Sequence, residues 1–194
     1  MGRPDLTEIR RREILDAFEE CVGRYGLEAS SLEMVAKHAG MKRSILRHYI
    51  GNRDDLVVAL AERVVAKYRQ AFEAFGETIT ENDRVEAILS YFFPSQPIET
   101  TADILVVESL IAASEQLPRV RELMFGYVDG LVTSLAKHLI LAFPKAGKQR
   151  CWRIAYGVVS VCFNQESLAP MQLPPRYLRS ARYCAQLMIQ SLAY

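Results

Sequence analysis

The chain has 194 residues, of which 50% are hydrophobic and 24% charged, and its formal net charge of +1 is ordinary for a globular protein. This length allows one large domain, or a small domain beside a medium one, and no run of about 20 apolar residues predicts a membrane span. No apolar stretch follows the N-terminus, so we expect no signal peptide and a location in the cytoplasm.

The sequence lacks the motifs of an enzyme or of a metal protein. It has no Ser/His/acid set, no phosphate loop and no metal motif, so we expect no catalytic residues, no metal and no cofactor. The cysteines are Cys21, Cys151, Cys162 and Cys184, and none forms a C-x-x-C pair. Each falls in an apolar helical pattern, so we expect buried, reduced thiols; a redox role is the alternative.

Apolar residues recur with helical spacing along nearly the whole chain, which predicts an all-α fold of about nine helices. We expect Ser30 and Glu33 to form a capping box, Gly76 to stop a long helix, and Asn82 and Thr100 to begin two others. The expected helices span about residues 7–25, 31–39, 42–50, 53–75, 82–93, 100–115, 119–143, 148–167 and 175–191.

The second and third of these helices have the spacing of a helix-turn-helix. Ala36 is small enough for a close crossing, Gly40 suits the turn, and the apolar Leu46 follows ten residues after Ala36. Residues 13–35 carry one basic and six acidic side chains, a net of −5, whereas residues 36–53 carry five basic and none acidic, a net of +5. A polyanionic partner responds to such a local field rather than to the average charge.

Residues 7–60 resemble the N-terminal domain of the tetracycline-repressor (TetR) family. The residues that carry this resemblance are Ile14-Leu15-Asp16-Ala17-Phe18, Gly26, Val35-Ala36-Lys37-His38-Ala39-Gly40-Met41, Leu46-Arg47-His48-Tyr49 and Asn52-Arg53-Asp54-Asp55-Leu56. The chain departs from the family at Lys42, Ser44 and Arg47, where Ser or Thr, Gly and an aromatic residue are usual. An arginine at the last position can hold a guanine, so this departure changes the base preference more than it removes binding.

The resemblance implies a three-helix DNA-binding domain over residues 1–52 and a helical ligand-binding and dimerisation domain over residues 53–194. Helix geometry favours Arg47, with Arg43 or His48, for base edges. We expect phosphate contacts from Lys42, Ser44, Tyr49, Arg53, Ser30 and Ser31, and Arg10, Arg11 and Arg12 add contacts from the N-terminal arm. A basic run can also be a solvated helix face, and Tyr49 can serve mostly in packing.

The second domain is expected to bind an effector and a second copy of the chain. Aromatic residues at helical spacing, together with Glu108 in an apolar run, are candidates for a small-molecule site: Tyr68, Phe72, Tyr91, Glu108, Phe125 and Trp152. Core packing is the alternative for the aromatic residues, and an outward face or an arginine partner for Glu108. The last two helices resemble the family's dimerisation pair, with Trp152, Tyr156, Val159, Phe163, Tyr177, Cys184, Leu187 and Met188 at the interface.

The sequence therefore predicts a homodimeric, sequence-specific regulator of transcription that binds a near-palindromic operator in double-stranded DNA. Repression, with release by a small molecule, is the family default. A dimeric small-molecule-binding module without DNA binding is the alternative function, and the five cations of residues 36–53 argue against it.

Overall fold

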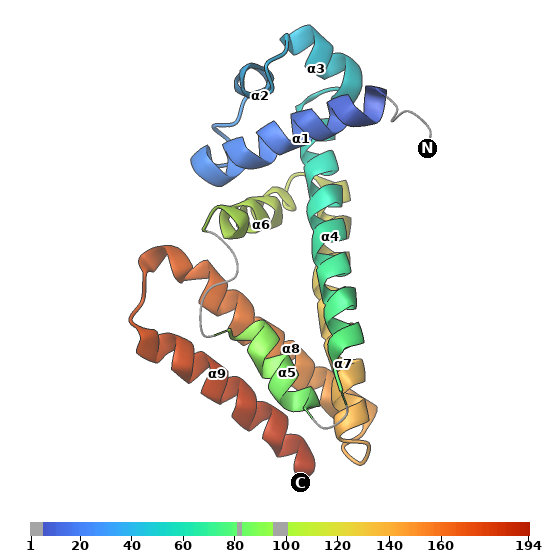
Figure 1. The fold of residues 1–194 in the computed structure, drawn as a ribbon, viewed down its shortest axis with the longest axis vertical. Coiled ribbons are helices and arrows are strands. Elements are labelled where there is room, and N and C mark those ends of the chain that lie inside the picture. The colour runs from blue at the N-terminus through green and yellow to red at the C-terminus, as the bar shows by residue number, and fades with distance from the viewer. Residues whose placement is uncertain (1–5, 81–82, 95–100) are drawn as a thin grey trace. The chain divides into compact units, whose positions relative to one another are not determined.

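The computed structural model describes residues 6–80, 83–94 and 101–194, and this part of the chain is mostly α-helical. It confirms the predicted all-α class, and the described residues form nine α-helices (Figure 1). Their bounds are α1 Leu6–Tyr25, α2 Leu32–His38, α3 Arg43–Ile50, α4 Arg53–Thr78, α5 Arg84–Phe92, α6 Thr101–Ala113, α7 Pro118–Ala142, α8 Lys148–Ser167 and α9 Pro175–Gln190, with short 3₁₀ helices η1 Ala169–Met171 and η2 Ser191–Ala193.

The chain divides into two compact units. Unit 1 comprises Met1–Ala66 with Glu99–Phe125, and unit 2 comprises Lys67–Ile98 with Gly126–Tyr194. Helices α4 and α7 therefore contribute residues to both units. These units follow packing, whereas the predicted boundary after residue 52 follows the end of the helix-turn-helix and stays a prediction.

Unit 1 is assembled around α1, which contacts α2, α3 and α6. The predicted apolar stripe of α1 is buried: Ile14, Ala17, Phe18, Cys21 and Val22. Helix α6 crosses α1 at Gly23, where a Cβ would lie only 2.9 Å from the Cβ of Ala102. Arg63 of α4 pairs with Asp16 and Glu19 of α1, so part of the acidic charge of residues 13–35 is matched inside unit 1.

Unit 2 has a core of its own, in which α8 and α9 pack along each other and α5 contacts α9 (Figure 1). The largest fully buried side chains of this core are Ile88, Leu89, Leu135, Leu139 and Ile189. At Gly157 of α8, a Cβ would lie 3.0 Å from the sulfur of Met188 on α9, a closer approach than most side-chain contacts allow. A larger residue at this position would require the Met188 side chain to move.

Some predicted details were wrong. Helix α4 runs past Gly76 to Thr78, because a glycine inside a helix that packs on a neighbour does not have to end it. Cys184 is exposed rather than buried, although Cys21, Cys151 and Cys162 are buried and reduced as expected. Burial raises the pKa of the Cys21 and Cys151 thiols, which makes them poor nucleophiles. The predicted helix starts Asn82 and Thr100 lie outside the described residues.

Among the described helices, none is long and apolar enough to cross a membrane. Nor do the described side chains include three or more His, Cys, Asp or Glu residues grouped so as to hold a metal ion.

Candidate nucleic-acid interface

Helices α2 and α3 are joined by the tight turn of a helix-turn-helix. The turn is closed by a hydrogen bond from the Met41 backbone N–H to the Ala36 carbonyl, at 2.9 Å, and by Gly40 at a φ of +63°. Its left-handed backbone at Gly40 is the conformation that glycine adopts without a steric penalty. Helix α3 is fixed on unit 1 by Leu46 and Ile50, which are both buried. The predicted motif is therefore present, with α3 as its second helix.

The start of α2 differs from the prediction. Ser31, not Ser30, is the N-cap, and its hydroxyl accepts a hydrogen bond from the Met34 backbone N–H at 3.2 Å. Ser30 is only 1% exposed and donates its hydroxyl hydrogen to the Gly26 carbonyl at 2.7 Å. Because Ser30 is enclosed in this way, the phosphate contact expected from its side chain is not available in this conformation.

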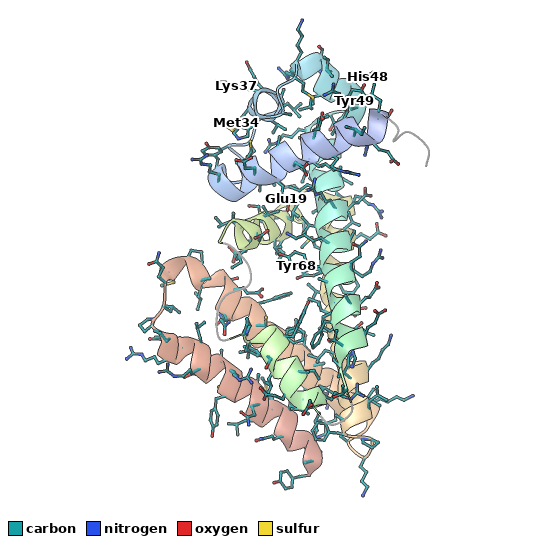
Figure 2. The ribbon with its side chains drawn as sticks, viewed as in Figure 1. Glu19, Met34, Lys37, His48, Tyr49 and Tyr68 are labelled. Atoms are coloured by element: carbon teal, nitrogen blue, oxygen red, sulfur yellow. The ribbon has the colours of Figure 1, made fainter. Side chains whose placement is uncertain are left out.

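Away from its buried side, α3 presents charged and polar side chains to solvent. Arg43, Ser44, Arg47 and His48 are all exposed, as the helical spacing predicted, and Lys42 stands exposed at the N-cap. Figure 2 shows His48 beside Tyr49 on this helix, with their rings edge to face at 5.1 Å. Tyr49 itself is half-buried. Six of the twelve predicted DNA-contacting residues thus lie on α3 or at its N-cap, where they can meet the edges and the backbone of DNA.

The exposed side of α3 also includes the apolar residue Ile45, which was not among the predicted DNA contacts. Its side chain is 41% exposed. Ile45 stays in water because the buried side of this short helix is already filled by Leu46 and Ile50. Apolar contact with the methyl group of thymine, or with deoxyribose, is open to such a residue.

Two arginines hold the motif in place through the backbone. Arg11 of α1 donates to the Tyr49 carbonyl in the last turn of α3, at 2.9 Å. Arg53, the first residue of α4, donates to the Ser30 carbonyl at 2.9 Å and to the Leu27 carbonyl at 2.7 Å. Both residues were predicted as DNA contacts, and the structure shows guanidinium groups that already bridge separate elements.

The start of α4 is capped by reciprocal hydrogen bonds. The Asn52 side chain accepts from the Asp55 backbone N–H at 3.0 Å, and the Asp55 carboxylate accepts from the Asn52 backbone N–H at 2.8 Å. This arrangement is a capping box, and it explains the acidic residue near the helix start. It fixes the chain that leads from α3 into Arg53.

The predicted ligand-binding residues fall in both units. In unit 2 the rings of Phe72 and Tyr91 lie 5.5 Å apart, and the ring of Tyr68 lies 5.5 Å from that of Tyr127 (Tyr68 is labelled in Figure 2). Trp152, also in unit 2, is 43% exposed and stacks on Tyr156.

Glu108 and Phe125 belong to unit 1, and Phe125 is 69% exposed, so it is not part of a core. Four further aromatic residues, beyond those predicted, make ring contacts in unit 2. Phe75 and Phe92 contact the rings of Phe72 and Tyr91. Tyr127 and Phe163 form a second ring cluster with Tyr68.

The predicted dimer residues separate into two groups. Five are exposed on α8 and α9, and these are Trp152, Tyr156, Tyr177, Cys184 and Leu187. The other three face the interior of unit 2, where Val159 is buried and Phe163 and Met188 are half-buried against the core. Val159 is therefore not accessible to a partner in this conformation, because an apolar stripe in a sequence does not distinguish a side that packs inside the chain from one that packs on a partner. The assignment of Phe163 and Met188 to the interface stays a prediction.

One histidine of unit 2 is held in an unusual environment. His138 of α7 lies with its Nδ1 3.1 Å from the guanidinium of Arg84. Burial and the nearby charge of Arg84 lower the pKa of His138 below its ordinary value. Its Nδ1 therefore accepts the hydrogen bond from Arg84, and the imidazole is neutral near pH 7.

Comparison with known proteins gives consistent matches. Residues 14–60 match the family model described as "Bacterial regulatory proteins, tetR family". The chain is 26% identical over 178 residues to the HTH-type transcriptional regulator BetI of Rhizobium meliloti, covering 89% of this chain and 86% of that protein.

Solved structures share the fold. A transcriptional regulator from Rhodococcus sp. Rha1 superposes with a TM-score of 0.79 at 18% identity, over 95% of this chain and 98% of that one. A protein from Saccharomonospora viridis, solved in complex with choline, gives a TM-score of 0.80 at 15% identity, over 94% of this chain and 96% of that one.

Proposed function

Because this chain belongs to the TetR family of bacterial regulatory proteins, which are DNA-binding regulators of transcription and not enzymes, we propose that it is a homodimeric repressor released from its operator by a small molecule. Its site of action is the cytoplasm, where bacterial operator DNA lies. The observation that carries the proposal is α3, a helix anchored by Leu46 and Ile50 whose exposed side presents Arg43, Arg47 and His48.

Reading of DNA sequence is assigned to the middle of α3. Arg47 is exposed and reaches solvent without an ion pair among the described residues, so its guanidinium is available for a bidentate contact with guanine. Arg43 lies one turn earlier on the same helix, with His48 beside Arg47. Lys42, Ser44 and Tyr49 flank these residues and are assigned to the phosphates.

Dimerisation is assigned to the exposed apolar side chains of α8 and α9. The parallel stack of Trp152 on Tyr156, together with Tyr177 and Leu187, leaves large apolar surfaces in water on two adjacent helices. Burying them against the same helices of a second copy forms a four-helix bundle with two-fold symmetry. A two-fold dimer presents two copies of α3, so the operator is a near-palindrome.

The effector is assigned to the ring cluster that Tyr68, Tyr127 and Phe163 form in unit 2. We propose that it is an organic cation. Tyr68, Tyr127 and Phe163 come from three helices, with ring centroids 5.5 Å apart for the first pair and 6.0 Å for the second. Aromatic faces attract cations, and Lys67 already holds its ammonium 5.6 Å from the centre of the Tyr68 ring. The choline complex of the Saccharomonospora viridis protein gives the class of ligand to try first.

Selection of duplexes from a random library with the purified protein tests the regulator function. The expected result is an enriched near-palindromic duplex. Light scattering of its complex should give the mass of one duplex with two protomers. Failure to enrich any motif, with a protein that is folded and dimeric, would support a ligand-binding module without DNA binding.

The effector proposal has its own test. Choline is titrated into the complex of the protein with the selected duplex, and 3,3-dimethylbutan-1-ol, which has the same shape without the charge, is the matched control. Release by choline and not by the neutral alcohol supports a cation site. Equal effects of both compounds would contradict it.

A further inference from the structure

A hollow of about 350 Å³ lies within unit 2, between the C-terminal half of α7 and the start of α8. The two helices are joined by a short turn (Figure 1). The lining residues that matter are two lysines, Lys137 and Lys148, and three apolar side chains, Ala136, Ile140 and Trp152. The hollow shares no residue with the ring cluster of Tyr68, Tyr127 and Phe163, and its volume falls in the range of small-molecule sites.

The apolar part of the lining includes a large ring that is left in water. Trp152 is 43% exposed even though it stacks on Tyr156, and it is the only tryptophan in the sequence. Ile140 is half-buried beside it. Covering such surface with apolar atoms of a ligand is favourable, so this part of the hollow suits a hydrocarbon chain or a ring.

The polar part of the lining is positive. Lys137 and Lys148 are exposed and have no ion pair among the described residues, and no acidic residue is among the side chains that line the hollow. Lys148 is also the first residue of α8, whose N-cap, Gly147, has no side chain to cap the helix, so the helix dipole adds to the positive potential.

The wider surroundings have the same sign of charge. Residues 145–194 carry seven basic side chains and one acidic, a net of +6, whereas residues 1–144 carry a net of −5. A ligand responds to this local field rather than to the overall charge of +1. An organic cation would therefore be repelled from the hollow, and a small inorganic anion would leave its apolar lining in water.

We propose that this hollow is a second small-molecule site of unit 2, and that it binds an amphipathic carboxylate such as a medium-chain fatty acid. The carboxylate lies against the ammonium groups of Lys137 and Lys148, and the apolar tail packs on Ile140 and Trp152. The site is independent of the proposed cation effector. It borders the exposed side of α8 that is assigned to dimerisation, because Trp152 belongs to both.

Fluorescence of Trp152 tests the proposal directly, because no other tryptophan contributes to the signal. The probe is ω-bromooctanoate, whose bromine quenches an indole on contact. We expect saturable quenching with half-saturation at roughly 1 mM, as suits so small a ligand. Unlabelled octanoate should reverse the quenching, and octan-1-ol, which has the same chain without the charge, should not.

Variants of the lysines test the carboxylate contact. Lys137→Gln combined with Lys148→Gln should weaken binding of the probe roughly 5- to 10-fold, because two partly exposed charge contacts are lost. The matched control is Lys145→Gln, which removes an exposed lysine of the turn between α7 and α8 that does not line the hollow, and it should bind like the wild type. Thr133→Phe, which fills the hollow from α7, should abolish the quenching in a protein that melts like the wild type.

Three outcomes would overturn the proposal. Quenching that does not saturate would show that the probe meets Trp152 only by collision. Equal reversal by octanoate and octan-1-ol would show an apolar site without selection for an anion. If the double lysine variant is a monomer by light scattering without any ligand, and octanoate makes the wild type a monomer too, the hollow is filled by a second copy of the chain.

Discussion

Replacement of Arg53 by alanine should destabilise the protein as well as weaken its binding to DNA. The guanidinium joins the start of α4 to the loop between α1 and α2 by donating to the carbonyls of Leu27 and Ser30, at 2.7 and 2.9 Å. Both carbonyls belong to buried residues, so water replaces the lost donors poorly. The neighbouring carboxylate of Glu28, 3.8 Å away and almost fully exposed, adds little.

The size of the effect follows from these two hydrogen bonds. A net contribution of about 1 kcal/mol for each gives a loss of about 2 kcal/mol for Arg53→Ala. For a chain of this length that loss lowers the melting temperature by roughly 4–8 °C. Arg53→Lys keeps the positive charge but not the planar fork that reaches two carbonyls, so we expect about half of the loss.

Melting followed by circular dichroism, combined with DNA titrations at several salt concentrations, separates the two roles of Arg53. We expect Arg53→Lys to keep the salt slope of the wild type while its melting temperature falls. The reasoning is refuted if Arg53→Ala has the melting temperature of the wild type while its slope of log K against log salt becomes shallower by about 1. Arg53 would then be a simple phosphate contact.

Three further predictions concern separate parts of the chain. Arg47→Ala should cost about 1–3 kcal/mol on the selected operator and relax the preference at one position of each half-site; an unchanged motif in a repeated selection would contradict base reading. Leu187→Glu should give a folded monomer by light scattering, because this side chain is exposed on α9, whereas a persistent dimer would place the interface elsewhere. The lowered pKa of His138 means that the unfolded state binds a proton at this residue more readily than the folded state. The free energy of unfolding should therefore fall as the pH drops below the ordinary histidine pKa of about 6.5. In denaturation measured between about pH 7 and 5, His138→Gln should reduce that loss.

The helices and the exposed, charged side of α3 could be predicted because they depend on local patterns. Apolar spacing put Leu46 on the inside of the motif and Arg47 on the outside, and both lie there. Gly40 indicated the turn, because glycine is the residue that most readily adopts the positive φ found there. Each of these features is set within a few residues of sequence.

Contacts between residues that are far apart in the sequence could not be predicted. Arg53 hydrogen-bonds to residues 23 and 26 positions away, and no local pattern shows that its guanidinium meets carbonyls. Val159 packs inside unit 2, although the apolar spacing of its helix is equally compatible with a surface that contacts a partner. The exposure of Ile45 could not be predicted, because periodicity does not tell that the buried side of an eight-residue helix is already filled.

The most direct test of the central claim is the ratio of affinities for the selected operator and for a random duplex of the same length, measured at one physiological salt concentration. A helix-turn-helix dimer that reads bases through α3 should prefer the operator by about 10³-fold or more. Arg47→Ala should reduce that ratio by roughly 10-fold or more, in line with the loss of a bidentate base contact. Equal affinities for the two duplexes would contradict the account, because the positive side of α3 would then bind DNA by charge alone.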